Sequence, residues 1–187
     1  MSAERLQVAV IIGSVRTGRI GPTVASWIET QLARRDDISL DIIDLADLTL
    51  PDRLDGTGDA AAFAKRADAA DAFVIVTPEY NHGYSGALKT AIDTLVDEWR
   101  AKPVAFVSYG GTAGGLRAVE QLRLVFAELH AATVRQVVSL HWVHDLFDDN
   151  GVLTDRGAVA AADKMADQLV WWARALRAAR ETGSYAA

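Results

Sequence analysis

The sequence predicts an α/β fold in which helices cover both faces of a parallel β-sheet. Short apolar runs rich in β-branched residues recur along the chain, and segments with helical periodicity lie between them. Right-handed crossovers between such strands restrict the sheet to a few doubly wound topologies. The 187 residues suffice for one well-filled core and contain no internal repeat or linker, so we expect a single domain over residues 1–187.

Each predicted strand is a nearly continuous apolar run bounded by Pro, Gly or charged residues, which is typical of a strand buried on both faces. The chain has such runs at residues 6–12, 40–45, 72–77, 104–108 and 133–138. Ligands of doubly wound sheets bind beyond the carboxyl ends of the strands. The loops that follow Ile12, Thr77 and Ser108 are therefore the candidates for a functional site.

The predicted helices lie between these strands and after the last one. The first begins at Gly21-Pro22, where proline suits a first turn, and a second follows Ser85-Gly86. Three more are expected at residues 60–70, 116–130 and 156–180. On the last helix we expect the sheet to cover Met165, Ala166, Leu169, Trp172, Ala173 and Leu176.

Two further features of these segments lead to expectations about exposure. Trp171 and Trp172 point about 100° apart on their helix, so one of them is expected to be exposed or covered by a second subunit. Residues 49–58 contain Pro51 and two glycines among charges, which predicts a mobile loop that could act as a lid.

Composition excludes several functions. Lys and Arg number 19 against 25 Asp and Glu, and this formal charge of -6 makes nucleic acid and anionic lipid poor candidate partners. The absence of Cys excludes disulfides, thiolate metal sites and a cysteine nucleophile. The apolar run that ends before Gly13 is too short for a signal peptide or a membrane span, so we expect a cytoplasmic protein.

The first candidate loop, GSVRTGRIGP at residues 13–22, has the features of a phosphate site. Backbone N–H groups, the helix dipole, the Ser14 hydroxyl and the guanidiniums of Arg16 and Arg19 would converge on an anion there. The alternative is a Gly-rich turn with solvated arginines, because short glycine motifs often occur without a ligand.

Two nucleotide-binding patterns are disfavoured for this loop. Arg19-Ile20 replaces the Lys-Ser/Thr pair of a Walker A loop, so the phosphate lysine and the Mg²⁺ ligand are both absent. The loop also lacks G-x-G-x-x-G, and Asp41 and Asp44 are ambiguous as acids that would bind a ribose. NTP hydrolysis and a tight dinucleotide site are therefore not expected.

The second loop, TPEYNHGYSGALKTAIDTL at residues 77–95, suits a flat ligand. Pro78 ends the strand, and Tyr80 and Asn81 lie where the edge of such a ligand would meet backbone amides. A half-buried loop aromatic is the alternative interpretation of Tyr80. Ser85 lies too far beyond the strand end to be the nucleophile of a G-x-S-x-G elbow, so acyl transfer is not expected.

The third loop, SYGGTAGGLR at residues 108–117, has four glycines in six positions. Such a backbone can approach a planar ligand closely and offer it N–H donors, although a flexible turn is the alternative. His141 and His144 suggest a metal pair, but no third ligand with recognisable spacing accompanies them. We therefore expect no metal.

Together, GSVRTGRIG, TPEYNHGYSGALKTAID and SYGGTAGGLRAVEQLR resemble the three signature loops of the NADPH-dependent FMN reductase family, over about residues 6 to 138. The resemblance implies a flavodoxin-like sheet of strand order 2-1-3-4-5, non-covalent FMN, reduction by NADPH or NADH, and a homodimer or a tetramer. Lys89 and Asp93 resemble the family's subunit-contact region, where Thr90 and Thr94 depart from the usual residues.

By this resemblance, residues of all three loops would bind FMN. Its phosphate would be held by Ser14, Arg16 and Arg19, inside the backbone of Gly18, Arg19, Ile20 and Gly21. The isoalloxazine and ribityl chain would be bordered by Pro78, Glu79, Tyr80 and Asn81, and the other flavin edge by Ser108, Tyr109, Gly110 and Gly111.

The cofactor also decides the predicted mechanism. FMN itself accepts the hydride at N5, so no catalytic side chain is expected. The prediction is a ping-pong cycle in which NAD(P)H is replaced by a small acceptor: a quinone, a free flavin, an azo compound or a metal oxyanion. The alternatives are a flavodoxin-like FMN electron carrier that NAD(P)H does not reduce, and a flavin-free phosphate-binding protein on the same fold. The two arginines of the first loop favour the reductase over the carrier.

Overall fold

Five parallel strands form one sheet in the computed structural model, which describes residues 5–148, 150–153, 155–183 and 185. Their order is β2-β1-β3-β4-β5. This order confirms the predicted α/β class and the flavodoxin-like topology. The strands are β1 (Leu6–Ile12), β2 (Ile38–Asp44), β3 (Ala72–Pro78), β4 (Pro103–Tyr109) and β5 (Ala132–Leu140).

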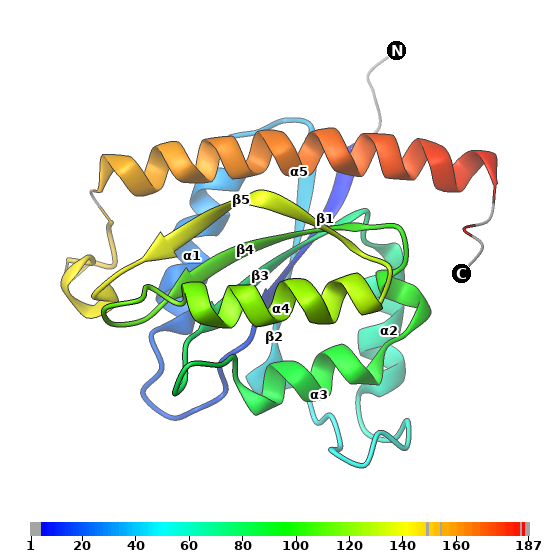
Figure 1. Cartoon of the computed structure of the whole chain (residues 1–187), viewed down its shortest axis with the longest axis horizontal. Coiled ribbons are helices and arrows are strands. Elements are labelled where there is room, and N and C mark those ends of the chain that lie inside the picture. Colours follow the sequence, from blue (N-terminus) through cyan, green and yellow to red (C-terminus); the bar gives the residue numbers. More distant parts are fainter. Residues whose placement is uncertain (1–4, 149, 154, 184, 186–187) are drawn as a thin grey trace.

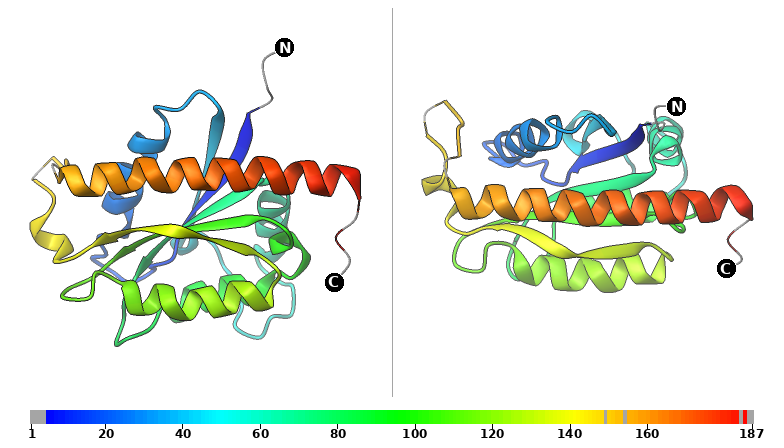
Figure 2. Two further views of the ribbon diagram at one scale, coloured as in Figure 1. Left: turned by 45° about the horizontal axis from the view of Figure 1, so that its top comes forward. Right: turned by 90° about the horizontal axis from the view of Figure 1, so that it is seen from above.

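Helices cover both faces of the sheet (Figure 1 and Figure 2). On one face lie α1 (Gly21–Leu32) and α5 (Arg156–Thr182), and on the other lie α2 (Ala60–Ala69), α3 (Gly86–Thr94) and α4 (Leu116–Glu128). Short 3-10 helices occupy Leu45–Asp47, Asp97–Trp99 and Val143–Asp145. No helix in the described part of the chain is both long and apolar enough to cross a membrane.

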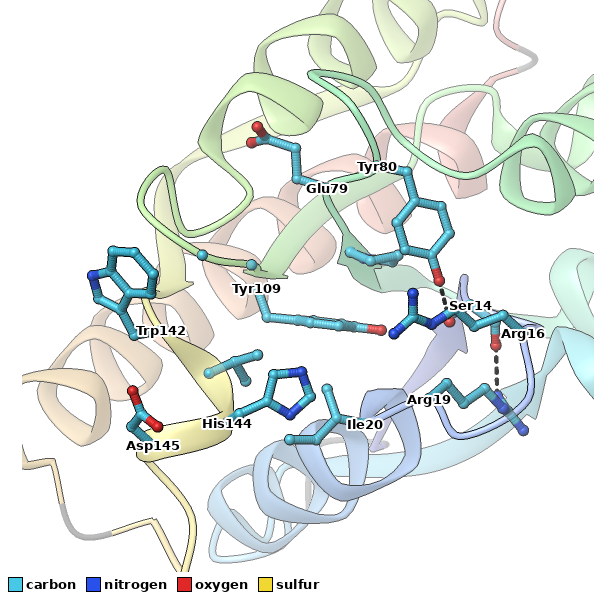
Figure 3. A pocket seen from close by; sticks show the side chains of 14 residues that line it. Ser14, Arg16, Arg19, Ile20, Glu79, Tyr80, Tyr109, Trp142, His144 and Asp145 are labelled. Carbon is cyan, nitrogen blue, oxygen red and sulfur yellow. Dashed lines mark hydrogen bonds between the residues drawn. The ribbon is translucent and has the colours of Figure 1, made fainter.

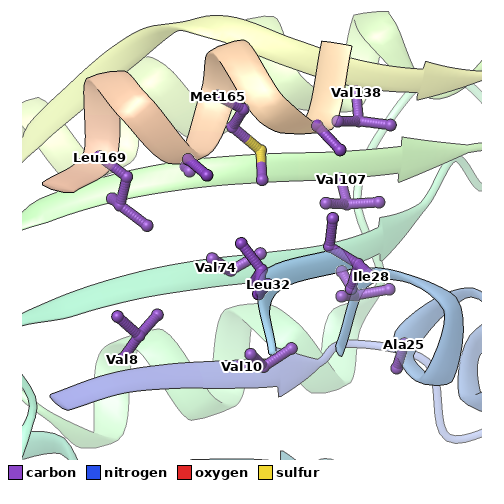
Figure 4. Packing of buried hydrophobic residues seen from close by; sticks show 14 of the residues in the cluster. Val8, Val10, Ala25, Ile28, Leu32, Val74, Val107, Val138, Met165 and Leu169 are labelled. Atoms are coloured by element: carbon purple, nitrogen blue, oxygen red, sulfur yellow. The ribbon is translucent and has the colours of Figure 1, made fainter. Parts of the chain in front are cut away.

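The two layers of helices bury separate apolar clusters against the same strands, because side chains alternate between the faces of a strand. Figure 4 shows the cluster under α1 and α5, where Val8, Val10 and Val74 of the sheet meet Ile28 and Met165. Strands β3 and β4 are buried along their whole length. This burial confirms the prediction, made from their continuous apolar runs, that these strands are covered on both faces.

The predicted burial of Trp172 is wrong. Residues Ala162, Ala166, Leu169 and Ala173 form the centre of the buried stripe of α5, and Val170 occupies one flank of it. Trp172 lies about a quarter of a turn from that centre on the other flank, and its side chain is exposed. Trp171 is exposed as well, and the two indoles meet edge to face with ring centroids 5.0 Å apart.

The sheet also determines where a ligand can bind. The first crossover leads from β1 to β2 on one side, and the next leads to β3 on the other side. The loops after β1 and β3 therefore diverge, and a crevice forms at the carboxyl ends of these two strands.

Candidate functional site

A pocket of about 320 Å³ opens at the carboxyl ends of β1, β3 and β4 (Figure 3). Its volume lies in the range of small-molecule sites. It is lined by Ser14, Arg16, Arg19, Ile20, Pro78, Glu79, Tyr80, Tyr109, Gly110, Gly111, Trp142, Val143, His144 and Asp145. The first ten of these belong to the predicted set, so the structure brings residues from all three predicted loops together.

Four predicted residues do not line this pocket. Gly18 adopts a φ of 68° in the loop after β1, and Gly21 begins α1. Asn81 adopts a φ of 50° in a tight turn, and Ser108 is buried and donates a hydrogen bond of 2.8 Å to the Gly114 carbonyl. The part of these four residues in binding FMN stays a prediction.

The Arg19 side chain is held in place by hydrogen bonds within the protein. Its guanidinium donates two hydrogen bonds of 2.7 Å to the Asp44 carboxylate and one of 2.6 Å to the Ser14 carbonyl. Both ionic side chains are largely buried, and the bonds to Asp44 raise the pKa of the guanidinium above its ordinary value. Because the charge of Arg19 is paired, this side chain holds the loop in shape.

Arg16, three residues earlier, is exposed. Its guanidinium lies over the Tyr80 ring, 5.8 Å from the centroid, and makes no ion pair with any described residue. Beneath it, the Ser14 and Tyr80 hydroxyls share a hydrogen bond of 2.8 Å that joins the first and second loops. This end of the pocket thus combines an unpaired cation with hydroxyl groups, which suits an anionic ligand.

Glu79 joins the second loop to the third. Its side chain is 6% exposed and forms an ion pair with Arg117 in the first turn of α4. The Arg117 side chain donates a hydrogen bond of 2.5 Å to this carboxylate, and the Arg117 backbone N–H donates one of 3.2 Å. A carboxylate is also stabilised by the dipole at a helix N-terminus.

The glycines of the third loop are required by packing. A Cβ atom on Gly114 would lie 2.4 Å from the Ser139 hydroxyl oxygen and 2.6 Å from the His141 ring. A Cβ atom on Gly115 would lie 2.6 Å from the Ser108 Cβ. Both glycines have positive φ, at 56° and 82°. These glycines therefore seat the loop on β4 and β5. The predicted close approach of this backbone to a planar ligand stays a prediction.

The loop after β5 supplies a fourth wall that sequence reasoning missed. Trp142, Val143, His144 and Asp145 all line the pocket. The two histidines of this segment were considered only as a metal pair, and no metal-binding cluster of three His, Cys, Asp or Glu side chains lies among the described residues. The rule that ligands bind beyond strand ends, applied to the fifth strand, is the signal that would have found this wall.

The loop at residues 49–58 is closed at its base. The Thr49 N–H donates a hydrogen bond of 2.7 Å to the Asp59 carboxylate, and the Asp59 N–H donates one of 3.0 Å to the Thr49 carbonyl. No residue of this loop lines the pocket described above. Its mobility and its action as a lid stay predictions.

Comparison with known protein families decides the assignment. The family model of the NADPH-dependent FMN reductases matches residues 6–145, which include all four walls of the pocket. The chain belongs to this family. Membership confirms the predicted resemblance.

Individual relatives and a solved structure are consistent with membership of this family. An NAD(P)H-dependent FMN reductase of Schizosaccharomyces pombe is 39% identical over 120 residues, which cover 58% of this chain and 60% of the relative. The match thus spans less than two thirds of that relative's length. A probable NADPH:quinone oxidoreductase of Oryza sativa is 32% identical over 82% of both chains. The solved flavoenzyme NAD(P)H:acceptor oxidoreductase of Paracoccus denitrificans has the same fold, with a TM-score of 0.75 at 22% identity over 90% of this chain and 97% of its own.

One buried hydroxyl of this FMN reductase family member tests the fit of the cofactor. The Tyr109 hydroxyl is buried and makes no hydrogen bond of normal length and angle with a described residue. Burial raises the pKa of this group to about 12, and the Ser14 hydroxyl nearby offsets only part of that effect. It points toward the first loop, where a Cβ atom on Gly21 would lie 2.9 Å away (Figure 3). A buried donor without a partner is costly. A phosphate or ribityl oxygen held by Ser14 and Arg16 would satisfy it, so these residues fit FMN.

Proposed function

We propose that this protein transfers a hydride from NADPH or NADH, by way of bound FMN, to a small acceptor in a ping-pong cycle. The acceptor is a quinone, a free flavin, an azo compound or a metal oxyanion. With a quinone, NAD(P)H and one proton from solvent give NAD(P)⁺ and the hydroquinone. The rice relative, which is named as a quinone oxidoreductase, supports a quinone as the acceptor.

The observation that best supports this proposal is the convergence of three predicted loops on one pocket that contains a buried hydroxyl without a partner. Ser14 and Arg16 would bind the phosphate, while Arg19 positions the Ser14 carbonyl through its own pairing with Asp44. The Tyr109 hydroxyl would donate to the cofactor, because a pKa of about 12 keeps it protonated at neutral pH. FMN supplies the hydride-accepting chemistry, so the side chains are needed for binding and orientation.

An anaerobic titration with NADPH tests the proposal. The protein is loaded with one equivalent of FMN and freed of unbound flavin, and the flavin absorption band is followed. We expect the band to bleach at about one NADPH per FMN, because each hydride carries the two electrons that a flavin takes up. Retained flavin that stays oxidised would instead support an electron carrier. A protein that retains no flavin would contradict the cofactor assignment.

We further propose that the protein assembles as a homodimer or a tetramer. The exposed indoles of Trp171 and Trp172 on α5 support a surface that a second subunit could cover. Sedimentation of the FMN-loaded protein measures its mass directly, and a monomer would contradict this proposal. The cytoplasmic location stays a prediction.

A further inference from the structure

The pocket has a large aromatic side chain at its rim that has no role in the function proposed above. Trp142 follows β5, lines the pocket and is 59% exposed (Figure 3). Its backbone is left-handed, with φ 49° and ψ 48°. This conformation is unfavourable for a bulky L-residue, so the surrounding structure must enforce it.

The third loop enforces this conformation through backbone hydrogen bonds. The Trp142 N–H donates to the Gly111 carbonyl at 3.2 Å, and the Val143 N–H donates to the Gly110 carbonyl at 3.1 Å. The Asp145 N–H closes the turn by donating to the Trp142 carbonyl at 2.8 Å. The indole itself lies beside Gly111, with a ring carbon 3.8 Å from where a Cβ atom of that glycine would stand. The side chain therefore stands at a defined place on the rim.

Stability alone does not account for an indole at this position. Val143, the next residue, is 3% exposed and anchors the loop in the apolar cluster under α1 and α5. The buried tryptophan Trp99 shows the structural alternative, because its ring packs on Phe73 and its indole N–H bonds the Ile92 carbonyl at 3.0 Å. Trp142 has no place in the core, and its indole N–H makes no hydrogen bond with a described residue.

The rim and the opposite end of the pocket suit ligands of different chemistry. Arg16 at the far end is an exposed cation, whereas Trp142 offers the face of an aromatic ring beside the two side-chain-free glycines Gly110 and Gly111. Flat aromatic groups stack on such faces, and a compact metal oxyanion gains little from them. The Glu79 carboxylate on this side is paired with Arg117, so it adds little net charge.

We propose that Trp142 is the stacking platform for the aromatic ring of the electron acceptor, and that it makes the enzyme selective for planar quinones over compact inorganic acceptors. The inference rests on the proposed function, since it names the acceptor class for that site. Trp142 acts by binding and orienting the acceptor, and the electron balance is that of quinone reduction given above.

A binding measurement that needs no NADPH tests this proposal first. Menadione, a planar naphthoquinone, is titrated into the oxidised, FMN-loaded protein by calorimetry, and because no reductant is present no turnover occurs. The variants are Trp142→Ala, Trp142→Phe and, as a control, Leu124→Ala, whose large apolar side chain is 76% exposed outside the pocket. We expect Trp142→Ala to weaken menadione binding about 3- to 10-fold, because aromatic pairs contribute about 0.5–1.5 kcal/mol. The Phe variant should stay within about 2-fold of the wild type, as should the control.

Steady-state selectivity gives the second measurement. The ratio of kcat/KM for menadione to kcat/KM for ferricyanide should fall about 3- to 10-fold in Trp142→Ala, through a higher KM for menadione. An unchanged ratio with unchanged menadione binding would overturn the proposal. So would weaker retention of FMN in this variant, or an equal loss in the rate of flavin bleaching by NADPH, because either result would assign Trp142 to another ligand.

The proposed function and the proposed role of Trp142 would be contradicted by different results. If NADPH does not bleach the flavin of the wild type, the proposed function is wrong, and menadione binding to the oxidised or flavin-free protein still decides the role of Trp142. If NADPH bleaches the flavin and Trp142→Ala binds menadione like the wild type, only the role of Trp142 is wrong.

Discussion

The loops after β1 and after β5 form opposite ends of the pocket, and each combines one anchored residue with one exposed residue nearby. After β1 the anchor is ionic, with Arg19 on Asp44, and the exposed residue is the cation Arg16. After β5 the anchor is the apolar Val143, and the exposed residue is the aromatic Trp142. Anchoring and the proposed ligand binding thus fall to different side chains, so mutations should separate stability from affinity.

The largest expected effect concerns the ionic anchor. Asp44→Ala would leave the Arg19 guanidinium largely buried without its carboxylate, and the side chains of this pair are only 17% and 15% exposed. We expect the FMN-free protein to lose about 2–3 kcal/mol of unfolding free energy, measured by urea denaturation.

The neighbouring strand residue Asp41 provides the matched control. It pairs with Arg66, but these side chains are 41% and 37% exposed. Asp41→Ala should therefore cost no more than about 1 kcal/mol, because exposed ion pairs contribute little. Equal losses in the two variants would show that the Arg19–Asp44 pair is not the anchor of its loop.

Replacing the exposed cation Arg16 at the same end should have the opposite effect to Asp44→Ala: it should lower ligand affinity and leave stability unchanged. Arg16→Ala should weaken FMN binding about 10- to 100-fold, because it removes a charge-assisted contact to the phosphate. The thermal unfolding of the FMN-free variant should stay close to that of the wild type, since Arg16 makes no ion pair with described residues. Fluorescence titration of FMN and thermal melts measure both quantities.

Arg53→Ala is the control for the change in net charge, because Arg53 is exposed in the loop that does not line the pocket. This variant should bind FMN like the wild type. If Arg16→Ala bound FMN equally well, Arg16 would have no part in the site. A destabilised Arg16→Ala apoprotein would remove the distinction between the anchor and the exposed cation.

The smallest of these effects belongs to the hydroxyl between the two ends. Tyr109→Phe removes a buried hydroxyl that has no partner among the described residues, so the FMN-free protein should be as stable as the wild type or slightly more stable. FMN binding should weaken about 3- to 10-fold through the lost hydrogen bond. Tyr84→Phe, outside the pocket, should leave FMN binding unchanged. Unaltered affinity in Tyr109→Phe would show that its hydroxyl does not reach the cofactor.

The sequence predicted the scaffold well because the relevant patterns are local. Continuous β-branched runs mark strands such as Ala72–Pro78, and a glycine-rich stretch marks the loop that follows β4. The rule that ligands bind at strand ends then placed the three loops at one edge of the sheet.

Contacts between segments far apart in the sequence could not be predicted from such local patterns. Asp44 reaches Arg19 because β1 and β2 pair with Ile12 opposite Asp44, and a single sequence does not specify that pairing. Trp172 was misplaced because helical periodicity gives the direction of a stripe but not how far its cover extends along the helix. Met165 on the same flank is buried, whereas Trp172, about two turns later, is exposed. The exposed indole of Trp142 depends on hydrogen bonds to a loop thirty residues earlier, which no local pattern records.

The interlocked loops after β4 and β5 also constrain how this protein can diversify. Gly114 leaves no room for a side chain because His141 packs against it, and two backbone hydrogen bonds join residues 142 and 143 to the glycines beyond β4. A shift of either backbone would move the other, so the two walls of the pocket after β4 and β5 form one mechanical unit. New acceptor preferences should therefore arise most readily by exchanging the side chain at position 142 on an unchanged backbone, which makes this position a natural first target for directed evolution.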